Sequence, residues 1–313
     1  MAAARLTAAT NVVTGSTNPA PAAATETPEQ IEQQFKKVMA EDDAAQAEVD
    51  QWIQDNQSAA DRGAAAPKAD LERRIRERFK PIRQAYEDFL QFHPDHARAR
   101  IAYGSFLSDL HDNPGAREQW EKALALNPKD PAPYNNLANL YSETGPVSKA
   151  FEFYDKAIEL NTREPLYYRN LGDAVYLFRT NAMDYYHLGE QQVCSKVLEL
   201  YSHALKLDPA NFPLASDVAQ IYYGIKPLRL DDALRAWTNA LAVAHDNIER
   251  EGVYLHFARL KLQADRFAEV HAHLNAVTNS MYTELKKRLL RSLEGAEQKA
   301  METNAPTAAP IKK

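Results

Sequence analysis

The sequence predicts an all-α protein built from repeated helical hairpins, and three observations support this fold class. Glycine is scarce, with ten residues in 313, while the strong helix formers Ala, Leu, Glu, Lys, Gln and Arg fill long stretches. Apolar residues recur at helical spacing along most of the chain. One ten-residue phrase also returns four times, which is typical of a stacked repeat array.

The N-terminal part is expected to contain a disordered segment followed by two helices. Residues 1–27 are dominated by Ala, Thr, Pro and Asn and lack periodicity, so they cannot bury enough apolar area to offset the entropy of ordering. A helix is expected to begin at Pro28, because Thr27 can cap it. A second amphipathic helix follows a polar break, with Pro81 as a point where it can kink. Residues 28–96 are therefore expected to form a pseudo-repeat or cap.

Four versions of one phrase predict the second helices of successive hairpins. They are QWEKALALNP, FYDKAIELNT, LYSHALKLDP and AWTNALAVAH, and their alanines Ala123, Ala157, Ala204 and Ala240 are separated by 34, 47 and 36 residues. Antiparallel helices approach closely only where one presents Gly or Ala, and large residues then fill the space beside that contact. A single hairpin cannot bury its apolar face alone, so three or more must stack.

A matching first helix precedes each phrase, and the combined pattern resembles the tetratricopeptide repeat family. The second unit has Tyr134, Leu137, Ala138, Tyr141, Ala150, Tyr154 and Ala157 in the order of the family pattern W-x2-L-G-x2-Y, then A-x3-F. Gly104 and Gly172 match the glycine of that pattern in the first and third units. The resemblance implies an array over 97–277, with units 97–130, 131–164, 165–211, 212–247 and a degenerate unit 251–277. It also implies that the hairpins stack into a right-handed superhelix, an α-solenoid.

Two departures from a plain array are expected. The third unit is 13 residues longer than the family period, around RTNAMDYYHLGEQQVCSK, and this insertion either extends its helices or protrudes as a loop. Insertions in repeat arrays often serve in binding, and a neutral spacer is the alternative. Within 278–303, the segment MYTELKKRLLRSLEGAE is expected to cap the array, with Met281, Leu285, Leu289 and Leu293 on one stripe. Residues 304–313 are expected to be a flexible tail.

The bulk composition argues against several classes of function. The net charge of −6 gives no overall basic field, so nucleic acid is not an expected partner. The basic runs ERRIRERFKPIR and KKRLLR are interpreted as solvated helix faces. No stretch is apolar and long enough for a transmembrane segment. The sequence leaves the location open: cytoplasmic, or exported or periplasmic if a signal precedes this chain.

No catalytic residue, cofactor or metal site is predicted from the sequence. The single cysteine, Cys194, excludes an internal disulfide and lacks a catalytic constellation around it. The histidine pairs His93 with His96 and His271 with His273 come without an accompanying ligand set, so they are interpreted as solvated histidines. No P-loop, GxGxxG or GxSxG motif is present. Carboxylate pairs that form only in space are left open.

The family resemblance implies a groove lined by the first helix of each unit. The second, fifth, ninth and twelfth residues of each unit are expected to point into this groove. They give the candidate peptide-binding residues Arg98, Asn135, Asn139, Arg169, Asp173, Tyr176, Gln220, Tyr223 and Arg259. The partner implied is a protein or extended peptide segment. The function predicted is a non-catalytic scaffold; the alternatives are a structural, self-associating subunit of a larger assembly and, third, an enzyme that uses the insertion in the third repeat.

The groove is not expected to hold a free C-terminal carboxylate. Family members with that specificity place two lysines, an arginine and two asparagines on three consecutive first helices. Asn139 and Asn170 match the asparagines, but Asn135, Pro213 and Asp217 occupy the three cationic places. A carboxylate would then meet an acidic group in place of a charge-assisted donor. We therefore expect an internal, extended segment as the ligand.

Overall fold

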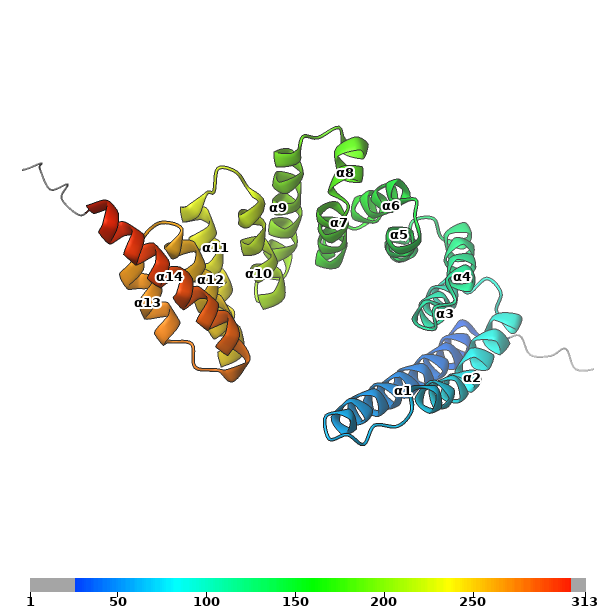
Figure 1. Ribbon diagram of the computed structural model, residues 1–313. Helices are drawn as coiled ribbons and strands as arrows, with labels where there is room; N and C mark the ends of the chain where they lie inside the picture. The colour runs from blue at the N-terminus through cyan, green and yellow to red at the C-terminus, as the bar shows by residue number, and fades with distance from the viewer. Residues whose placement is uncertain (1–25, 305–313) are drawn as a thin grey trace, which may run out of the picture. The chain divides into compact units, whose positions relative to one another are not determined.

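The structure, a computed structural model, describes residues 26–304, and every regular element in this range is a helix (Figure 1). The all-α fold class is therefore confirmed. The expected disordered segment 1–27 and the tail lie almost wholly outside the described residues. Contacts divide the chain into two units, the first ending at Pro94 and the second beginning at Asp95.

The first unit is a helical hairpin of α1 (Pro28–Ala60) and α2 (Lys68–Phe92). Thr27 and Gln30 form a capping box at the start of α1, as the sequence predicts for Thr27. The Tyr86 hydroxyl donates to Asp42 Oδ2 at 2.7 Å across the hairpin, and burial raises the pKa of the Asp42 carboxyl. The helix α2 continues through Pro81.

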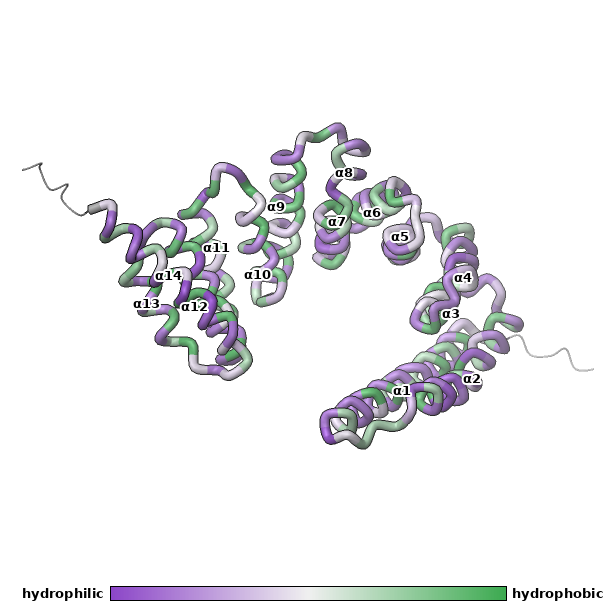
Figure 2. Tube along the Cα trace, viewed as in Figure 1, coloured by the Kyte–Doolittle hydropathy of each residue, from purple (hydrophilic) through white to green (hydrophobic). Residues whose placement is uncertain are grey.

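The second unit is a stack of five helical hairpins. Their helices are α3 (Ala97–Asp109) with α4 (Asn113–Leu126), α5 (Pro131–Thr144) with α6 (Val147–Leu160), α7 (Pro165–Leu177) with α9 (Glu190–Leu207), α10 (Phe212–Ile221) with α11 (Leu230–Ala242), and α12 (Asn247–Leu262) with α13 (Phe267–Asn275). The second helix of each hairpin also packs against the first helix of the next. Hydrophobic and hydrophilic residues are mixed along each of these helices (Figure 2), and the buried positions are almost all apolar.

Small residues lie at the closest helix crossings, as the repeat pattern predicts. The alanines Ala123, Ala157, Ala204 and Ala240 of the repeated phrase are all 0% exposed. At Gly104 a Cβ atom would lie 2.6 Å from Trp120 Cδ1, a distance too short for a carbon–carbon contact. The first and third units therefore need glycine where a large aromatic ring of the second helix lies against the first.

We expect Gly104→Ala to destabilise the protein by about 1–3 kcal/mol, because the added methyl group overpacks against the indole of Trp120. Urea unfolding followed by circular dichroism measures the effect. Gly295→Ala is the matched control, since a Cβ there meets nothing within 4 Å. Equal stability of the two variants would contradict the close approach of α3 and α4.

The insertion in the third unit forms a helix. The short α8 (Arg179–Tyr186) stands between α7 and α9, and His187 ends it in the left-handed conformation with φ 55°. Among the neighbours of α8 is α6 of the preceding hairpin (Figure 1). The insertion therefore forms a separate short helix, and the expected extension holds for α9, which has 18 residues where α4 and α6 have 14.

The end of the array differs from the expectation in two details. The helix α12 begins at Asn247, ahead of the expected unit start at 251, because Asp246 caps it through the Glu249 amide. The last helix, α14 (Thr283–Asn304), follows the 3-10 turn η2 (Ser280–Tyr282). The predicted stripe on this segment is wrong at its first two positions, since Met281 is 68% exposed and Leu285 is 37% exposed.

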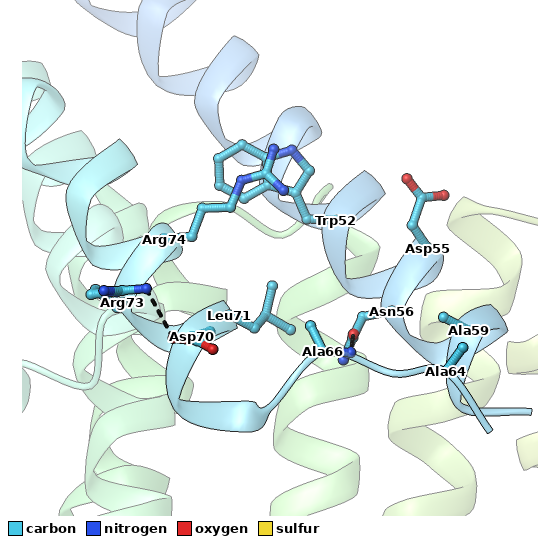
Figure 3. A pocket seen from close by; sticks show the side chains of 10 residues that line it. All are labelled: Trp52, Asp55, Asn56, Ala59, Ala64, Ala66, Asp70, Leu71, Arg73 and Arg74. Atoms are coloured by element: carbon cyan, nitrogen blue, oxygen red, sulfur yellow. Dashed lines mark hydrogen bonds and ion pairs between the residues drawn. The ribbon is translucent and has the colours of Figure 1, made fainter.

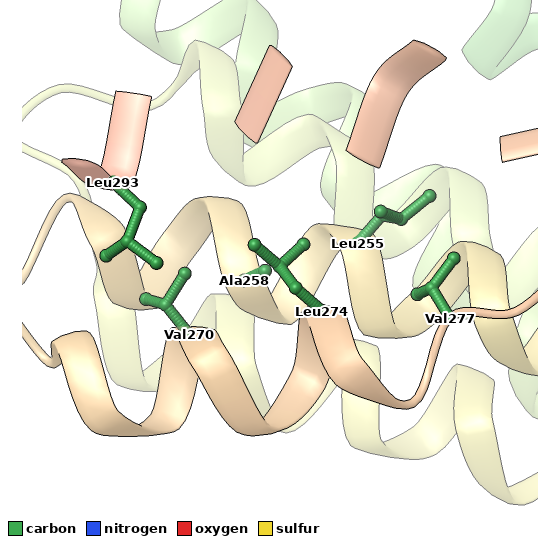
Figure 4. Close-up of a cluster of buried hydrophobic side chains, with 6 residues drawn as sticks. All are labelled: Leu255, Ala258, Val270, Leu274, Val277 and Leu293. Carbon is green, nitrogen blue, oxygen red and sulfur yellow. The ribbon is translucent and has the colours of Figure 1, made fainter. Parts of the chain in front are cut away.

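The apolar contact of α14 is centred further along the helix. Leu293 is buried in a cluster with Leu255, Ala258, Val270, Leu274 and Val277 (Figure 4). Leu289 and Leu290 pack against this cluster and are partly buried. The carboxylate of Glu251 also fixes the segment before η2, because it accepts bonds from the Thr278 and Asn279 amides at 2.9 and 2.7 Å. These bonds hold the pKa of Glu251 below its usual value.

Candidate functional site

The candidate groove residues all lie on the first helices or the 3-10 turn η1 (Tyr222–Gly224) that extends α10. The structure places them in three classes of exposure. Arg98, Asn139, Asp173, Tyr176, Gln220 and Arg259 are exposed, Arg169 and Tyr223 are half-buried, and Asn135 is buried.

Polar side chains join the first helices of successive hairpins. The Asn136 amide donates to Ser105 Oγ at 3.3 Å, and the Asn170 amide donates to Asn135 Oδ1 at 2.9 Å. Arg169 Nη2 lies 3.4 Å from Asp217 Oδ2, and the Tyr223 hydroxyl lies 3.0 Å from His256 Nδ1. We call this series of contacts the polar ladder. Its four contacts link the five hairpins of the described array in order.

Asn135 does not fit the expected role of a ligand contact. Its side chain is 4% exposed, and its amide oxygen already accepts a bond from Asn170. The fifth position of this unit therefore turns into the interface between the second and third hairpins. Asn135 therefore joins two hairpins and is not an exposed side chain.

Sequence reasoning missed the sixth position of the units. Asn136, Asn170 and Asp217 stand at this position in the second, third and fourth units, and all three belong to the polar ladder. A polar residue recurring at one position of three units was the signal that could have found them. His256 stands at the same sixth position of the expected unit 251–277, so it carries the same signal in a fourth unit.

Tyrosines of the second helices hold the ninth-position residues in place. The Tyr154 hydroxyl donates to Asn139 Oδ1 at 2.6 Å, and the Tyr201 hydroxyl donates to Asp173 Oδ1. Burial raises the pKa of Tyr154 to about 12, so this hydroxyl stays a donor at neutral pH. Asn139 and Asp173 are thus exposed groups with fixed orientation, which lowers the entropy that a ligand contact would cost.

Charges in the third and fourth units lie close together. Burial raises the pKa of the Asp217 carboxyl, while Arg169 lowers it and Asp173 raises it. Arg169 Nε is buried and makes no hydrogen bond to the described residues. Because this Nε is inaccessible, only the exposed part of the guanidinium, which pairs with Asp217, can meet a further acceptor.

An aromatic and basic group lies at the other end of the candidate set. The guanidinium of Arg259 stands 4.6 Å from the centroid of the Tyr223 ring. His256 stacks on Trp237 with ring centroids 3.8 Å apart. Burial and the nearby Arg259 lower the pKa of His256 to about 4, so this imidazole is neutral at pH 7.

A hollow of about 200 Å³ opens between α3 and α5. Its lining residues are Ser105, Ser108, Asp109, Trp120, Asn136, Asn139, Leu140 and Glu143. Amide and hydroxyl groups dominate its walls, so it suits backbone or polar side-chain groups of an extended chain. Of the residues predicted from the sequence, Asn139 lines this hollow.

The first unit has a separate cavity of about 530 Å³ near the turn of its hairpin (Figure 3). The guanidinium of Arg74 lies 3.6 Å over the Trp52 ring, and Arg73 pairs with Asp70 at 2.9 Å. The Asn56 side chain accepts a bond from the Ala66 amide. These charged and polar groups already satisfy one another, so the cavity favours no particular ligand chemistry.

The histidines and the cysteine have ordinary partners. His96 caps α3 through Nδ1, which accepts from the Ala99 amide at 3.1 Å, and His271 pairs with Glu297 at 2.9 Å. Burial raises the pKa of the Cys194 thiol. Within residues 26–304 no three His, Cys, Asp or Glu side chains are grouped so that they would hold a metal ion. No helix in this range is long and apolar enough to cross a membrane.

Comparisons with known proteins agree with the repeat architecture. Residues 109–145 match the family described as TPR repeat, and residues 132–163 match the family described as Tetratricopeptide repeat. A comparison with curated protein sequences gives no match. The chain is a tetratricopeptide repeat protein.

Solved structures show the same fold at low sequence identity. The structure of YrrB, described as a TPR protein with an unusual peptide-binding site, aligns with a TM-score of 0.51 and 12% identity, over 69% of this chain and 99% of that one. The structure of PilF from Pseudomonas aeruginosa aligns with a TM-score of 0.50 and 17% identity, over 82% of this chain and 99% of that one. At these identities the similarity establishes the helical repeat solenoid and nothing further.

Proposed function

We propose that this protein is a non-catalytic scaffold whose groove of first helices binds an extended segment of a partner protein. The observation that carries the proposal is the row of exposed, oriented groups on successive first helices, above all Asn139 and Asp173, which buried tyrosines hold in place. Solenoid repeats present extended surfaces of this kind to partners. YrrB, which has a similar fold, is described as having a peptide-binding site, and a peptide is the ligand class we propose here.

The contacts we propose follow from exposure. Asn139 offers amide hydrogen bonds to the ligand backbone, and the Arg169 side chain, which is 37% exposed, offers a guanidinium donor to an acceptor of the ligand. Tyr176, which is 43% exposed, and Tyr223 offer aromatic faces. Because Asp173 and Asp217 flank Arg169, a free C-terminal carboxylate is disfavoured, and an internal segment is the preferred ligand.

Replacing Asn139 and Arg169 together by Ala is expected to lower the affinity for a partner protein about tenfold or more, since two oriented polar contacts are lost. The partner is first captured by affinity purification. Isothermal titration with the partner segment measures this. The control variant Asn239→Ala with Arg235→Ala removes the same two residue types from α11, a second helix, and should bind normally. The helical circular dichroism signal should stay unchanged in both variants.

Two results would contradict the proposed groove. One is tight binding of an acidic peptide that ends in a free carboxylate. The other is equal binding of the partner segment by the first-helix and the second-helix variants, because the contact would then lie outside the groove.

A further inference from the structure

The insertion helix α8 is anchored on the preceding hairpin through aromatic contacts. The Phe151 ring of α6 lies 5.4 Å from Tyr185 and 5.5 Å from Tyr186 by ring centroids, and Phe151 is 0% exposed. The Tyr186 hydroxyl donates to Asp155 Oδ2 at 3.0 Å. Lys196 of α9 stands 4.0 Å over the Tyr186 ring. The insertion is thereby held in place and brings Tyr185 beside α6.

A cavity of about 450 Å³ lies where Tyr185 meets α6. Its lining residues are Tyr134, Glu152, Phe153, Asp155, Lys156, Glu159 and Tyr185. Three aromatic rings and three carboxylates thus face one space. Lys156 pairs with both oxygens of Glu159, at 3.0 and 2.9 Å, so its charge is offset within the cavity wall. Lys196 acts on Asp155 and offsets part of its charge, so Glu152 gives the cavity its remaining negative charge.

The carboxylates of this cavity lie close to its aromatic rings. Burial raises the pKa of the Tyr185 hydroxyl, and the nearby carboxylates of Asp155 and Glu152 raise it further. The Phe153 ring is held in place by Tyr134 at 5.8 Å and Tyr141 at 5.6 Å. Fixed aromatic rings beside carboxylates attract organic cations, because the ring faces and the acidic oxygens favour the same charge.

We infer that this cavity is a second binding site, which takes the lysine or arginine side chain of a basic segment of a partner protein. The aliphatic stem lies along Phe153 and Tyr185, and the cationic head lies between Asp155 and Glu152. The site shares no residue with the candidate groove, so it extends the proposed function and does not depend on it. It also gives the insertion a role, since Tyr185 completes the aromatic wall.

The repeat itself provides a matched control. Glu118 and Glu121 stand 34 residues before Glu152 and Asp155, at the same positions of the first hairpin, and both are exposed on α4. No insertion helix lies in that hairpin, whose helices α3 and α4 follow each other directly. Neutralising either pair changes the net charge of the protein by the same amount.

The test uses the full chain and a fluorescein-labelled peptide of alternating glycine and arginine, its lysine counterpart, and a glutamate counterpart as the negative probe. Fluorescence anisotropy should show binding of the basic peptides. Glu152→Gln with Asp155→Asn, and separately Tyr185→Ala, should weaken this binding about fivefold or more. Glu118→Gln with Glu121→Gln, and the groove variant Asn139→Ala with Arg169→Ala, should stay within about twofold. Thermal melts confirm that each variant is folded.

Three results would overturn the inference. The first is no binding of either basic peptide at about 1 mM protein. The second is equal weakening by the Glu118 and Glu121 pair, which would mean general attraction to an acidic protein. The third is unchanged binding by Tyr185→Ala, which would remove the aromatic wall from the site. A loss of binding in the groove variant alone would place the basic peptide in the groove, and that also contradicts a second site.

Discussion

A chain that ends before Thr283 is expected to aggregate, because α14 covers the apolar face of the last hairpin. Leu255, Val270 and Leu274 of that hairpin are at most 3% exposed and pack in one cluster with Leu293 of α14. Truncation would uncover this cluster, and a terminal repeat without a polar outer cover leaves an apolar patch that associates with other copies. We therefore propose that α14 caps the array.

Point variants test whether the buried face of α14 stabilises the array. Leu293 is 0% exposed, so Leu293→Ala should lower the free energy of unfolding by about 2–5 kcal/mol through lost burial and the cavity left behind. Leu285 on the same helix is 37% exposed, so Leu285→Ala should change it by less than about 1 kcal/mol. Urea unfolding measures both variants, and light scattering measures the truncated chain. A truncated chain that stays monomeric with the same unfolding midpoint would show that α14 is not the cap.

The fold could be predicted from the sequence because each repeat unit carries the same pattern of small and large residues. The phrase with Ala123, Ala157, Ala204 and Ala240 marks the closest helix crossings, and the structure leaves those alanines no exposed surface. Gly104 needs the same closeness to Trp120. A pattern that recurs in every unit averages out local ambiguity, so hairpin order follows directly from it.

Features that occur once in the chain could not be predicted in this way. The helix α8 packs on α6 through Tyr185 and Tyr186, a contact between different units that no periodic pattern encodes. The stripe of α14 was correct at Leu289 and Leu293 and wrong at Met281 and Leu285, because the sequence does not show which part of the segment contacts the last hairpin. In both cases the tertiary partner decides the outcome.

The positions of the candidate groove residues on the first helices could be predicted, but the exposure of their side chains could not. The projection from repeat positions finds Asn139 and Asp173, which are exposed, and also Asn135, which is 4% exposed. Whether a polar side chain faces a ligand or the next hairpin depends on the pairing residue in that hairpin. Asn170 provides such a partner for Asn135, and Asp217 provides one for Arg169. The nine candidate contacts stay a prediction for the experiments above.

Acidification is expected to destabilise the protein through His256, in a window between its ordinary pKa of 6.5 and its value in the folded protein of about 4. The imidazole is half-buried against the Trp237 ring at 3.8 Å, Tyr223 Oη lies 3.0 Å from Nδ1, and Arg259 is the nearby charge. Burial and Arg259 both oppose a proton on the ring. The unfolded chain therefore binds this proton more readily than the folded one, so stability is present above about pH 6.5 and is lost as the pH falls toward 4.

The contribution of His256 must be separated from carboxyls that act in the opposite direction. Burial raises the pKa of Asp42, Asp155 and Asp217 in the folded state, and these groups favour the folded state as the pH falls. The comparison is therefore between the wild type and His256→Gln, each unfolded by urea at about pH 7 and about pH 4.5. The wild type should lose about 2 kcal/mol more than the variant between the two conditions, because only the wild type carries the titrating ring. Equal losses would mean that the imidazole is protonated in the folded protein and that its stacking on Trp237 does not exclude the charge.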